Sequence, residues 1–220
     1  MKIKWLGHAC FLLTSEAGTK IMTDPFDDSV GYPVPNEEAD IVTTSHDHFD
    51  HSYIKAVKNP KDGKFLHINS PGRYSRNDII ITGVSTYHDQ AEGKNRGRNV
   101  VFVIDIDGLR VCHCGDLGHI PDSRQIAEIG HIDVLLAPVG GTFTINAKEA
   151  CQVVSLLKPS VTVPMHYKTP ALRFNLDGVD KFLSAAGLST RTDIYAHKRG
   201  IEITKANIKT LPEVIVLDYM

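Results

Sequence analysis

Cysteine, tryptophan and surplus charge of either sign are all scarce in this sequence. Its 220 residues include 4 cysteines and 1 tryptophan, and the formal net charge is -2 at pH 7. A near-neutral chain without a broad basic stretch is not typical of proteins that bind nucleic acids, and an acidic tail is absent as well. The charge balance therefore counts against nucleic acid as a partner. A small-molecule substrate is the expected partner, and association into a homo-oligomer stays open.

The cysteines lie apart in the sequence and form no Cys-x-x-Cys pair, so they indicate neither a disulfide framework nor a zinc ribbon. We expect free, buried thiols at Cys10, Cys112, Cys114 and Cys151, which fits a reducing cytoplasm. The first residues lack the apolar core of a signal peptide, and no apolar run approaches the ~18 residues of a membrane helix. The prediction is a cytoplasmic protein that does not enter a membrane.

Short apolar stretches bounded by turn residues predict a chain rich in β-strands. Turn sequences at 16–19 and at Asp107-Gly108 predict hairpins. The predicted strands cover residues 2–6, 10–14, 20–23, 39–44, 64–68, 78–87, 100–106, 109–114, 133–137, 161–164, 193–196 and 214–217.

Apolar residues at helical spacing predict helices mainly in the second half of the chain. The predicted helices cover residues 52–58, 121–129, 147–158 and 178–186. Asn146 with Glu149 matches a capping box, and Asp177 is expected to cap the last helix. No repeat or linker interrupts this order, so we predict one α/β domain over residues 1–220, with packed sheets and helices outside them.

The most informative stretch is Thr43–Ser52, which contains His46, His48, Asp50 and His51 in a chain with 11 histidines. Residues two apart in an extended segment point the same way, so His46 and His48 can hold one metal while Asp50 and His51 turn toward another. These ligand types suit Zn²⁺, and also Mn²⁺, Fe²⁺ or Ni²⁺. A solvated polar loop is the competing interpretation, but so dense a cluster favours metal binding.

Further residues of these types occur where predicted strands end, at His88, Asp116 and His166. Strand ends of layered sheets meet along one edge, where sites are usually built. Taken alone, each distal histidine would be a surface or core residue, but together with the 46–51 cluster we favour ligation. The set is large enough for two metals, with Asp116 as the bridge because a carboxylate has two oxygens.

These motifs together resemble the metallo-β-lactamase superfamily. Within it, the sequence is similar to a branch that contains metal-dependent hydrolases and L-ascorbate-6-phosphate lactonases. The stretches that carry this narrower resemblance are Gly7–Leu13, Thr23–Phe26, Pro138–Thr144 and Val163–Tyr167.

The resemblance implies a four-layer αββα sandwich with a site at one edge of its two sheets. It assigns His46, His48 and His88 to the first metal, assigns Asp50, His51 and His166 to the second, and places Asp116 between them. Asp24 stands where the family has a carboxylate that orients the ligand loop.

Two other motifs of this branch leave alternatives open. His8 is expected either to line the active site as a catalytic residue or to cap a turn. Gly140-Gly141, followed by Thr142, either lets backbone amides approach a ligand closely or forms a tight turn.

The predicted activity is metal-dependent hydrolysis at two zinc ions. A hydroxide shared by the metals would attack an ester, lactone or phosphoester bond of a small molecule, and Asp50 would orient that nucleophile or pass on its proton. The loop 92–99 carries Lys94, Arg96 and Arg98, which either contact a phosphate or carboxylate or belong to a solvated hairpin. Contact would favour an anionic substrate.

Three alternatives stay open at this point. One is a nuclease or phosphodiesterase of the same fold, which the charge balance disfavours. Another is a mononuclear iron oxygenase, and the third is a metal-binding protein without catalysis, which the complete ligand set disfavours. Two zinc or manganese ions per chain would support hydrolysis, and one iron per chain would support oxidation.

Overall fold

Two six-stranded β-sheets face each other in the computed structural model, which describes residues 1–188 and 199–219. The first sheet has the order β12 (Gly200–Glu202), β1 (Lys2–Gly7), β2 (Cys10–Thr14), β3 (Lys20–Thr23), β4 (Ile41–Thr43) and β5 (Leu66–Ile68). The second has the order β11 (Val161–Met165), β10 (Val134–Pro138), β9 (Leu109–His113), β8 (Arg98–Ile106), β7 (Ile79–Tyr87) and β6 (Gly72–Arg76). Both sheets mix parallel and antiparallel pairs.

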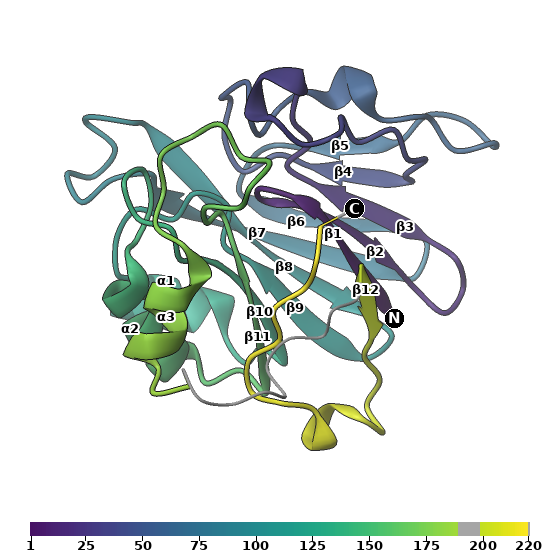
Figure 1. The fold of residues 1–220 in the computed structure, drawn as a ribbon. Helices are drawn as coiled ribbons and strands as arrows, with labels where there is room; N and C mark the ends of the chain where they lie inside the picture. The colour runs from purple at the N-terminus through teal and green to yellow at the C-terminus, as the bar shows by residue number, and fades with distance from the viewer. Residues whose placement is uncertain (189–198, 220) are drawn as a thin grey trace.

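The helices α1 (Ser123–Ile129), α2 (Ala147–Leu157) and α3 (Val179–Ala185) lie together on the side of the second sheet that faces away from the first (Figure 1). Loops and the short 3-10 helices η1 (Asp28–Val30) and η2 (Ile54–Ala56) form the corresponding layer on the first sheet. The predicted αββα sandwich is confirmed, although this outer layer contains no α-helix among the described residues.

Alternation of side chains explains how the first sheet contributes to two cores. Leu13, Ile21 and Ile41 belong to the large apolar cluster that also contains the second sheet. Their chain neighbours point the other way and pack under the outer loops with Val30 and Leu172; they are Leu12, Met22 and Val42. Both faces of these strands are therefore buried, and the sheet is anchored from both sides.

The capping predictions had mixed outcomes. The Asn146 side chain accepts hydrogen bonds from the backbone amides of Lys148 and Glu149, and the Glu149 carboxylate accepts from the Asn146 amide, so the predicted capping box is confirmed. The prediction for Asp177 is wrong: α3 begins after Gly178, and the Asp177 carboxylate instead pairs with Lys181 at 2.6 Å.

Several predicted elements differ in the structure. The helix predicted over 52–58 is wrong, since only the single turn η2 forms there. The strand predicted over 214–217 is also wrong, because the segment makes isolated bridges, such as that of Val214 to Thr162, and no continuous strand. The predicted strand 193–196 lies outside the described residues.

Two observed strands, β6 and β12, were not predicted. Strand β6 has the sequence GRYSR and no buried residue, so it lacks the apolar alternation that marks a half-buried strand. Strand β12 has only three residues.

The cysteines are free, as predicted, and three of them are buried, whereas Cys151 is partly exposed. Among the described residues, no helix combines the length and the apolar character needed to cross a membrane.

Candidate metal centre

Strand direction brings the predicted site residues to one edge of the sandwich. Strands β1 and β4 run in the same direction in the first sheet, as do β7, β9 and β11 in the second. Each site residue lies in the loop or turn that follows one of these strands. They are His8 after β1, His46, His48, Asp50 and His51 after β4, His88 after β7, Asp116 after β9 and His166 after β11. The edge therefore collects ligand types from both sheets.

The first group contains His46, His48 and His88, as the resemblance implies. One ring nitrogen of each lies within 4.8 Å of the others. The centroid of the His46 ring is 4.4 Å from that of His48 and 4.7 Å from that of His88. His88 is buried, His46 is half-buried and His48 is exposed, so this group opens toward solvent.

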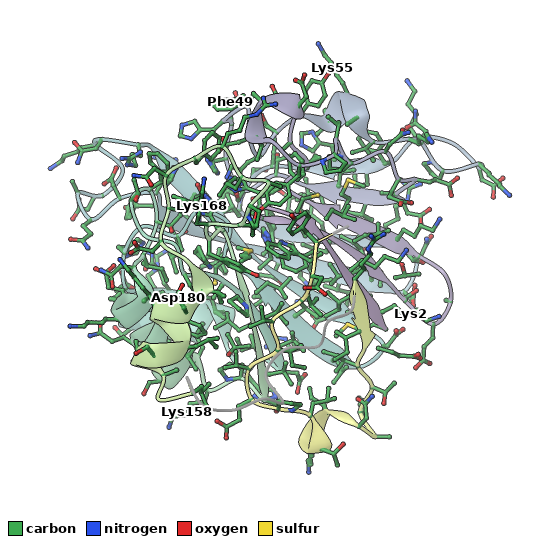
Figure 2. All side chains as sticks on the ribbon, viewed as in Figure 1. Lys2, Phe49, Lys55, Lys158, Lys168 and Asp180 are labelled. Atoms are coloured by element: carbon green, nitrogen blue, oxygen red, sulfur yellow. The ribbon has the colours of Figure 1, made fainter. Side chains whose placement is uncertain are left out.

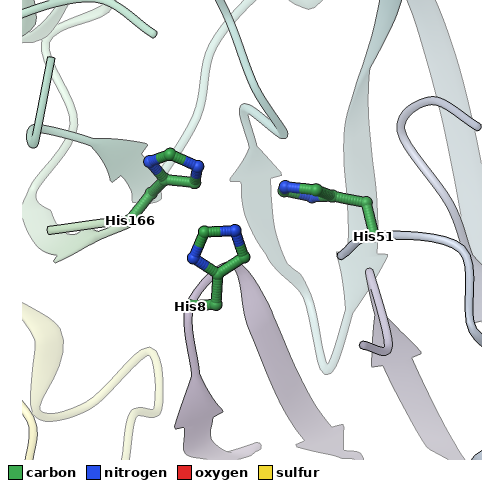
Figure 3. Close-up of side chains that lie close together, drawn as sticks. All are labelled: His8, His51 and His166. Carbon is green, nitrogen blue, oxygen red and sulfur yellow. The ribbon is translucent and has the colours of Figure 1, made fainter. Parts of the chain in front are cut away.

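A second group contains His51, His166 and also His8, whose ring nitrogens lie within 4.8 Å of one another. Figure 3 shows the three rings gathered around a common space, although they come from three separate segments of the chain. Asp50 lies beside them, with its Oδ2 3.2 Å from His8 Nε2 and 3.7 Å from His51 Nε2. His8 therefore lines the site.

Asp116 lies between the two groups and turns one oxygen toward each. Its Oδ1 is 3.2 Å from His51 Nε2 and 3.3 Å from His166 Nε2. Its Oδ2 is 3.3 Å from His88 Nε2 and 4.0 Å from His46 Nε2. This division of the two oxygens is the geometry expected of a bridging carboxylate.

Several buried polar atoms at this edge have no hydrogen-bond partner within residues 1–188 and 199–219. Four of them face the space between the ligands: Nε2 of His46, His51 and His166, and Oδ1 of Asp116. A buried polar atom left unpaired costs about 1–3 kcal/mol. Cations contacted by all of these atoms would remove that cost, and imidazole with carboxylate is a donor set that suits Zn²⁺. The residues present therefore fit a metal centre.

The shifted pKa values of most of these groups favour the forms that bind metal, which are neutral imidazole and ionised carboxylate. Burial, reinforced by the nearby His51, lowers the pKa of His46 to about 3, so its imidazole is neutral. Burial acts against ionisation of Asp116, but His166 and His51 outweigh it and hold the pKa of this carboxyl well below its ordinary value. Burial also acts to lower the pKa of His51, whereas the Asp116 and Asp24 carboxylates raise it overall.

Asp24 holds the ligand loop from behind. Its carboxylate accepts hydrogen bonds from the Ser45 amide at 2.8 Å, the Ser45 hydroxyl at 2.6 Å and His51 Nδ1 at 2.9 Å. One carboxylate oxygen of Asp24 also lies within 4.8 Å of ring nitrogens of His46 and His51, as in a group that could hold a metal. The three hydrogen bonds already occupy the oxygens of Asp24, so we do not assign it as a ligand. It orients His51 so that Nε2 faces Asp116, the role that the resemblance implies.

The turn that carries Asp116 depends on two neighbours. The Asn99 side chain accepts a hydrogen bond from the Asp116 amide at 2.9 Å and donates to the Cys114 carbonyl at 2.9 Å. Gly115 has a φ of +54°, and a Cβ there would lie 2.3 Å from Ser45 Cβ. Sequence reasoning missed Asn99, because a single polar residue near the start of β8 has no distinguishing pattern.

Comparison with known proteins agrees with the geometry. The sequence model of the β-lactamase superfamily domain matches residues 2–166. The chain belongs to the metallo-β-lactamase superfamily.

Within this superfamily, the chain is similar to metal-dependent hydrolases along most of its length. It is 30% identical to a UPF0173 metal-dependent hydrolase of Archaeoglobus fulgidus, over 93% of this chain and 100% of that protein. It is 35% identical to one of Methanoculleus marisnigri, over 80% of this chain and 86% of that protein. The crystal structure of a candidate Zn-dependent hydrolase of the superfamily from Thermotoga maritima matches with a TM-score of 0.80 and 43% identity, over 100% of this chain and 99% of that one. The chain is thus a member of the metal-dependent hydrolases.

His8 and the Gly140-Gly141 turn both support the backbone of this superfamily site. The His8 carbonyl accepts hydrogen bonds from the His166 amide at 3.1 Å and from Trp5 Nε1 at 3.0 Å. A Cβ on Gly140 would lie 2.2 Å from the His166 carbonyl oxygen. Of the two interpretations of the glycines, the structure favours a tight turn packed against His166.

A cleft of about 190 Å³ opens over the candidate metal centre. It is lined by His48, Phe49, Asp50, His88, Arg96, Asp116, Phe143 and Phe174. Of the three basic residues in the predicted loop, only Arg96 lines the cleft. Phe49 is 56% exposed, and Figure 2 shows it near the surface of the molecule. Sequence reasoning missed the three phenylalanines, which come from separate loops and share no spacing.

Proposed function

We propose that this member of the metallo-β-lactamase superfamily hydrolyses an ester, lactone or phosphoester bond of a small molecule at a dinuclear zinc centre. The observation that supports it most directly is the division of the Asp116 oxygens between two groups of imidazoles. A site for a single cation would not require histidines on both sides of one carboxylate.

In this proposal, each group of ligands holds one cation. His46, His48 and His88 form the first site, and Asp50, His51 and His166 form the second, with Asp116 shared. Mn²⁺, Fe²⁺ and Ni²⁺ use the same donor types. Such a pair of cations lowers the pKa of bound water and stabilises negative charge on the substrate.

Asp50 is proposed to act in catalysis as well as to bind metal, and His8 is proposed to position it. Asp50 lines the cleft, so its carboxylate can orient the attacking water and accept its proton. His8 is fully buried, and its Nε2 lies 3.2 Å from Asp50 Oδ2. A hydrogen bond from this nitrogen fixes the direction of the carboxylate, which is the positioning that general-base catalysis needs.

The test combines metal analysis with a substrate panel. We expect two zinc or manganese ions per chain in the purified protein, and hydrolysis of at least one member of a panel of lactones, esters, phosphodiesters and thioesters. His8→Gln should lower kcat with metal content unchanged, because His8 acts through Asp50. One iron per chain without hydrolysis would contradict the proposal and favour the oxygenase.

A further inference from the structure

The loop that follows His88 is held in one conformation by its own backbone. The Asp89 carboxylate is buried and accepts hydrogen bonds from the amides of Ala91 at 2.7 Å, Gly93 at 2.9 Å, Asn95 at 3.0 Å and Arg96 at 2.7 Å. A hairpin loop held only by water would not place four backbone amides around one buried carboxylate, so the interpretation of this loop as a solvated hairpin is disfavoured. These hydrogen bonds therefore fix the backbone from which the Arg96 side chain extends.

The Arg96 guanidinium lies over the Phe143 ring at the edge of the cleft. Its Cζ is 4.8 Å from the centroid of the Phe143 ring, and Nη2 lies 3.5 Å from the Thr142 carbonyl oxygen. Among the described residues, no carboxylate forms an ion pair with it. A guanidinium stacked on an aromatic ring keeps N–H groups along its edge free for a carboxylate or phosphate.

An apolar wall stands beside this cation. The ring centroid of Phe174 is 6.2 Å from that of Phe49, 6.4 Å from that of Phe143 and 5.6 Å from that of His8. Lys168 Nζ donates a hydrogen bond of 2.8 Å to the Phe174 carbonyl, which anchors the wall through its backbone. Exposed aromatic surface around a cleft marks a place where a ligand binds.

The cleft thus presents three kinds of surface within a small volume. The candidate metal ligands form its floor, phenylalanines form a wall, and Arg96 lies at the rim. Its volume of about 190 Å³ is below the roughly 300–1,000 Å³ typical of sites for drug-sized ligands. A metabolite of a few carbon atoms fits this space better than a polymer.

We propose that Arg96 selects the substrate by binding an oxyanion, carboxylate or phosphate, at the end remote from the scissile bond. A short apolar segment between the two ends lies against Phe143 and Phe174, and the scissile bond reaches the floor of the cleft. The substrate class is a small anionic ester or lactone. This inference rests on the proposed function, which supplies the reaction at the floor.

The test uses three ligands of equal chain length that differ at one end. Pentanoate ends in a methyl group, glutarate in a second carboxylate and 4-phosphonobutanoate in a phosphonate. Titration calorimetry on the zinc-loaded protein should show glutarate or 4-phosphonobutanoate binding about ten- to a hundredfold more tightly than pentanoate, as expected for hydrogen bonds to a charged group. The stronger of the two identifies the oxyanion.

Variants separate contact with Arg96 from the general effect of charge. Arg96→Ala should abolish the preference for the anionic ligands, and Arg96→Lys should retain part of it. Lys94→Ala removes the same charge from the same loop but from a residue that does not line the cleft, so the preference should change less than threefold. Equal losses in Arg96→Ala and Lys94→Ala, or no preference in the unmodified protein, would overturn the inference.

A kinetic comparison keeps this inference apart from the proposed function. The monomethyl ester of glutarate and methyl pentanoate are assayed by proton release with the same variants. Selective loss of glutarate ester turnover in Arg96→Ala supports the inference. If neither ester is hydrolysed, ester hydrolysis as the proposed function fails for these substrates, and the calorimetric preference still decides the role of Arg96.

Discussion

The floor of the cleft and its rim, which from here on includes the phenylalanine wall as well as Arg96, are built in opposite ways. On the floor, His51 is fully buried, and its orientation is fixed by a hydrogen bond from its own side chain to Asp24. On the rim, Arg96 and Phe49 are exposed, and the fixed element is the backbone beneath the side chain, as in the amides around Asp89. We infer that the floor determines the chemistry and that the rim determines which molecule undergoes it.

The largest expected effect comes from removing a ligand on the floor. His166→Ala should lose one of the two metals and lower kcat/KM by at least about 10²- to 10³-fold, because stabilisation of charge in the transition state is lost. Elemental analysis and assays on the active member of the panel measure both changes. His131→Ala removes a histidine whose side chain is 73% exposed, and it should change neither. Full metal content in His166→Ala would remove this residue from the ligand set.

A smaller effect on metal binding is expected from Asp24, which contacts the ligand His51 and is not itself assigned as a ligand. Asp24→Asn keeps the shape of the side chain but weakens its hold on His51, which should lower zinc affinity by about 10- to 100-fold. Competition with a chelator of known affinity measures this change. Asp47→Asn alters an exposed carboxylate in the same loop and serves as the control. Equal affinities in the two variants would show that Asp24 does not support the floor.

Acid should lower the free energy of unfolding of the metal-free protein through the buried histidines of the floor. Burial, with a contribution from His166, lowers the pKa of His8 to about 4, whereas an unfolded histidine titrates near 6.5. The unfolded chain therefore takes up protons first, and the free energy of unfolding should fall as the pH drops from about 6.5 toward 4. His51, whose pKa is raised, acts in the opposite direction but is outnumbered by His8, His46 and His88.

Denaturant titrations of the chelator-treated protein at pH 7 and pH 5 test this dependence. His8→Phe removes one of the buried titrating groups, so its stability should vary less with pH than that of His131→Gln. Identical stability of the unmodified protein at the two pH values would contradict the expectation.

The smallest expected effect lies at the rim. Phe49→Ala removes apolar contact surface worth about 1 kcal/mol, so KM should rise by about fivefold with metal content unchanged. Tyr53→Ala is the control, since Tyr53 is 38% exposed but does not line the cleft. A loss of metal in Phe49→Ala would contradict the assignment of Phe49 to the rim, because it would show that this residue also supports the metal ligands.

The floor was predictable from sequence for a physical reason. Four of its residues lie within 46–51, and the others directly follow strands or lie just beyond them, so local pattern and strand direction were enough to place them together. The rim was not predictable in the same way. Arg96, Phe143 and Phe174 meet only because three loops fold over the same edge, and nothing in their spacing indicates it.

Polar residues also set limits on the prediction of the fold. Strand β6 is exposed, so its pairing with β7 depends on backbone hydrogen bonds that leave no apolar pattern in the sequence. Asp177 lies one residue before Gly178, which occupies the cap position of α3, and its carboxylate pairs with Lys181 instead, so a residue type typical of caps does not by itself fix where a helix begins.

The position of Asp116 between two groups of histidines has a consequence for how the protein matures. His46 and His51 follow a strand of the first sheet, whereas His88, Asp116 and His166 follow strands of the second, so the two halves of the site approach only when the sandwich has closed. A pair of cations held by both halves would act as a crosslink between them. Metal insertion would then be a late event that seals an already assembled chain, and a fully loaded centre would report that folding is complete.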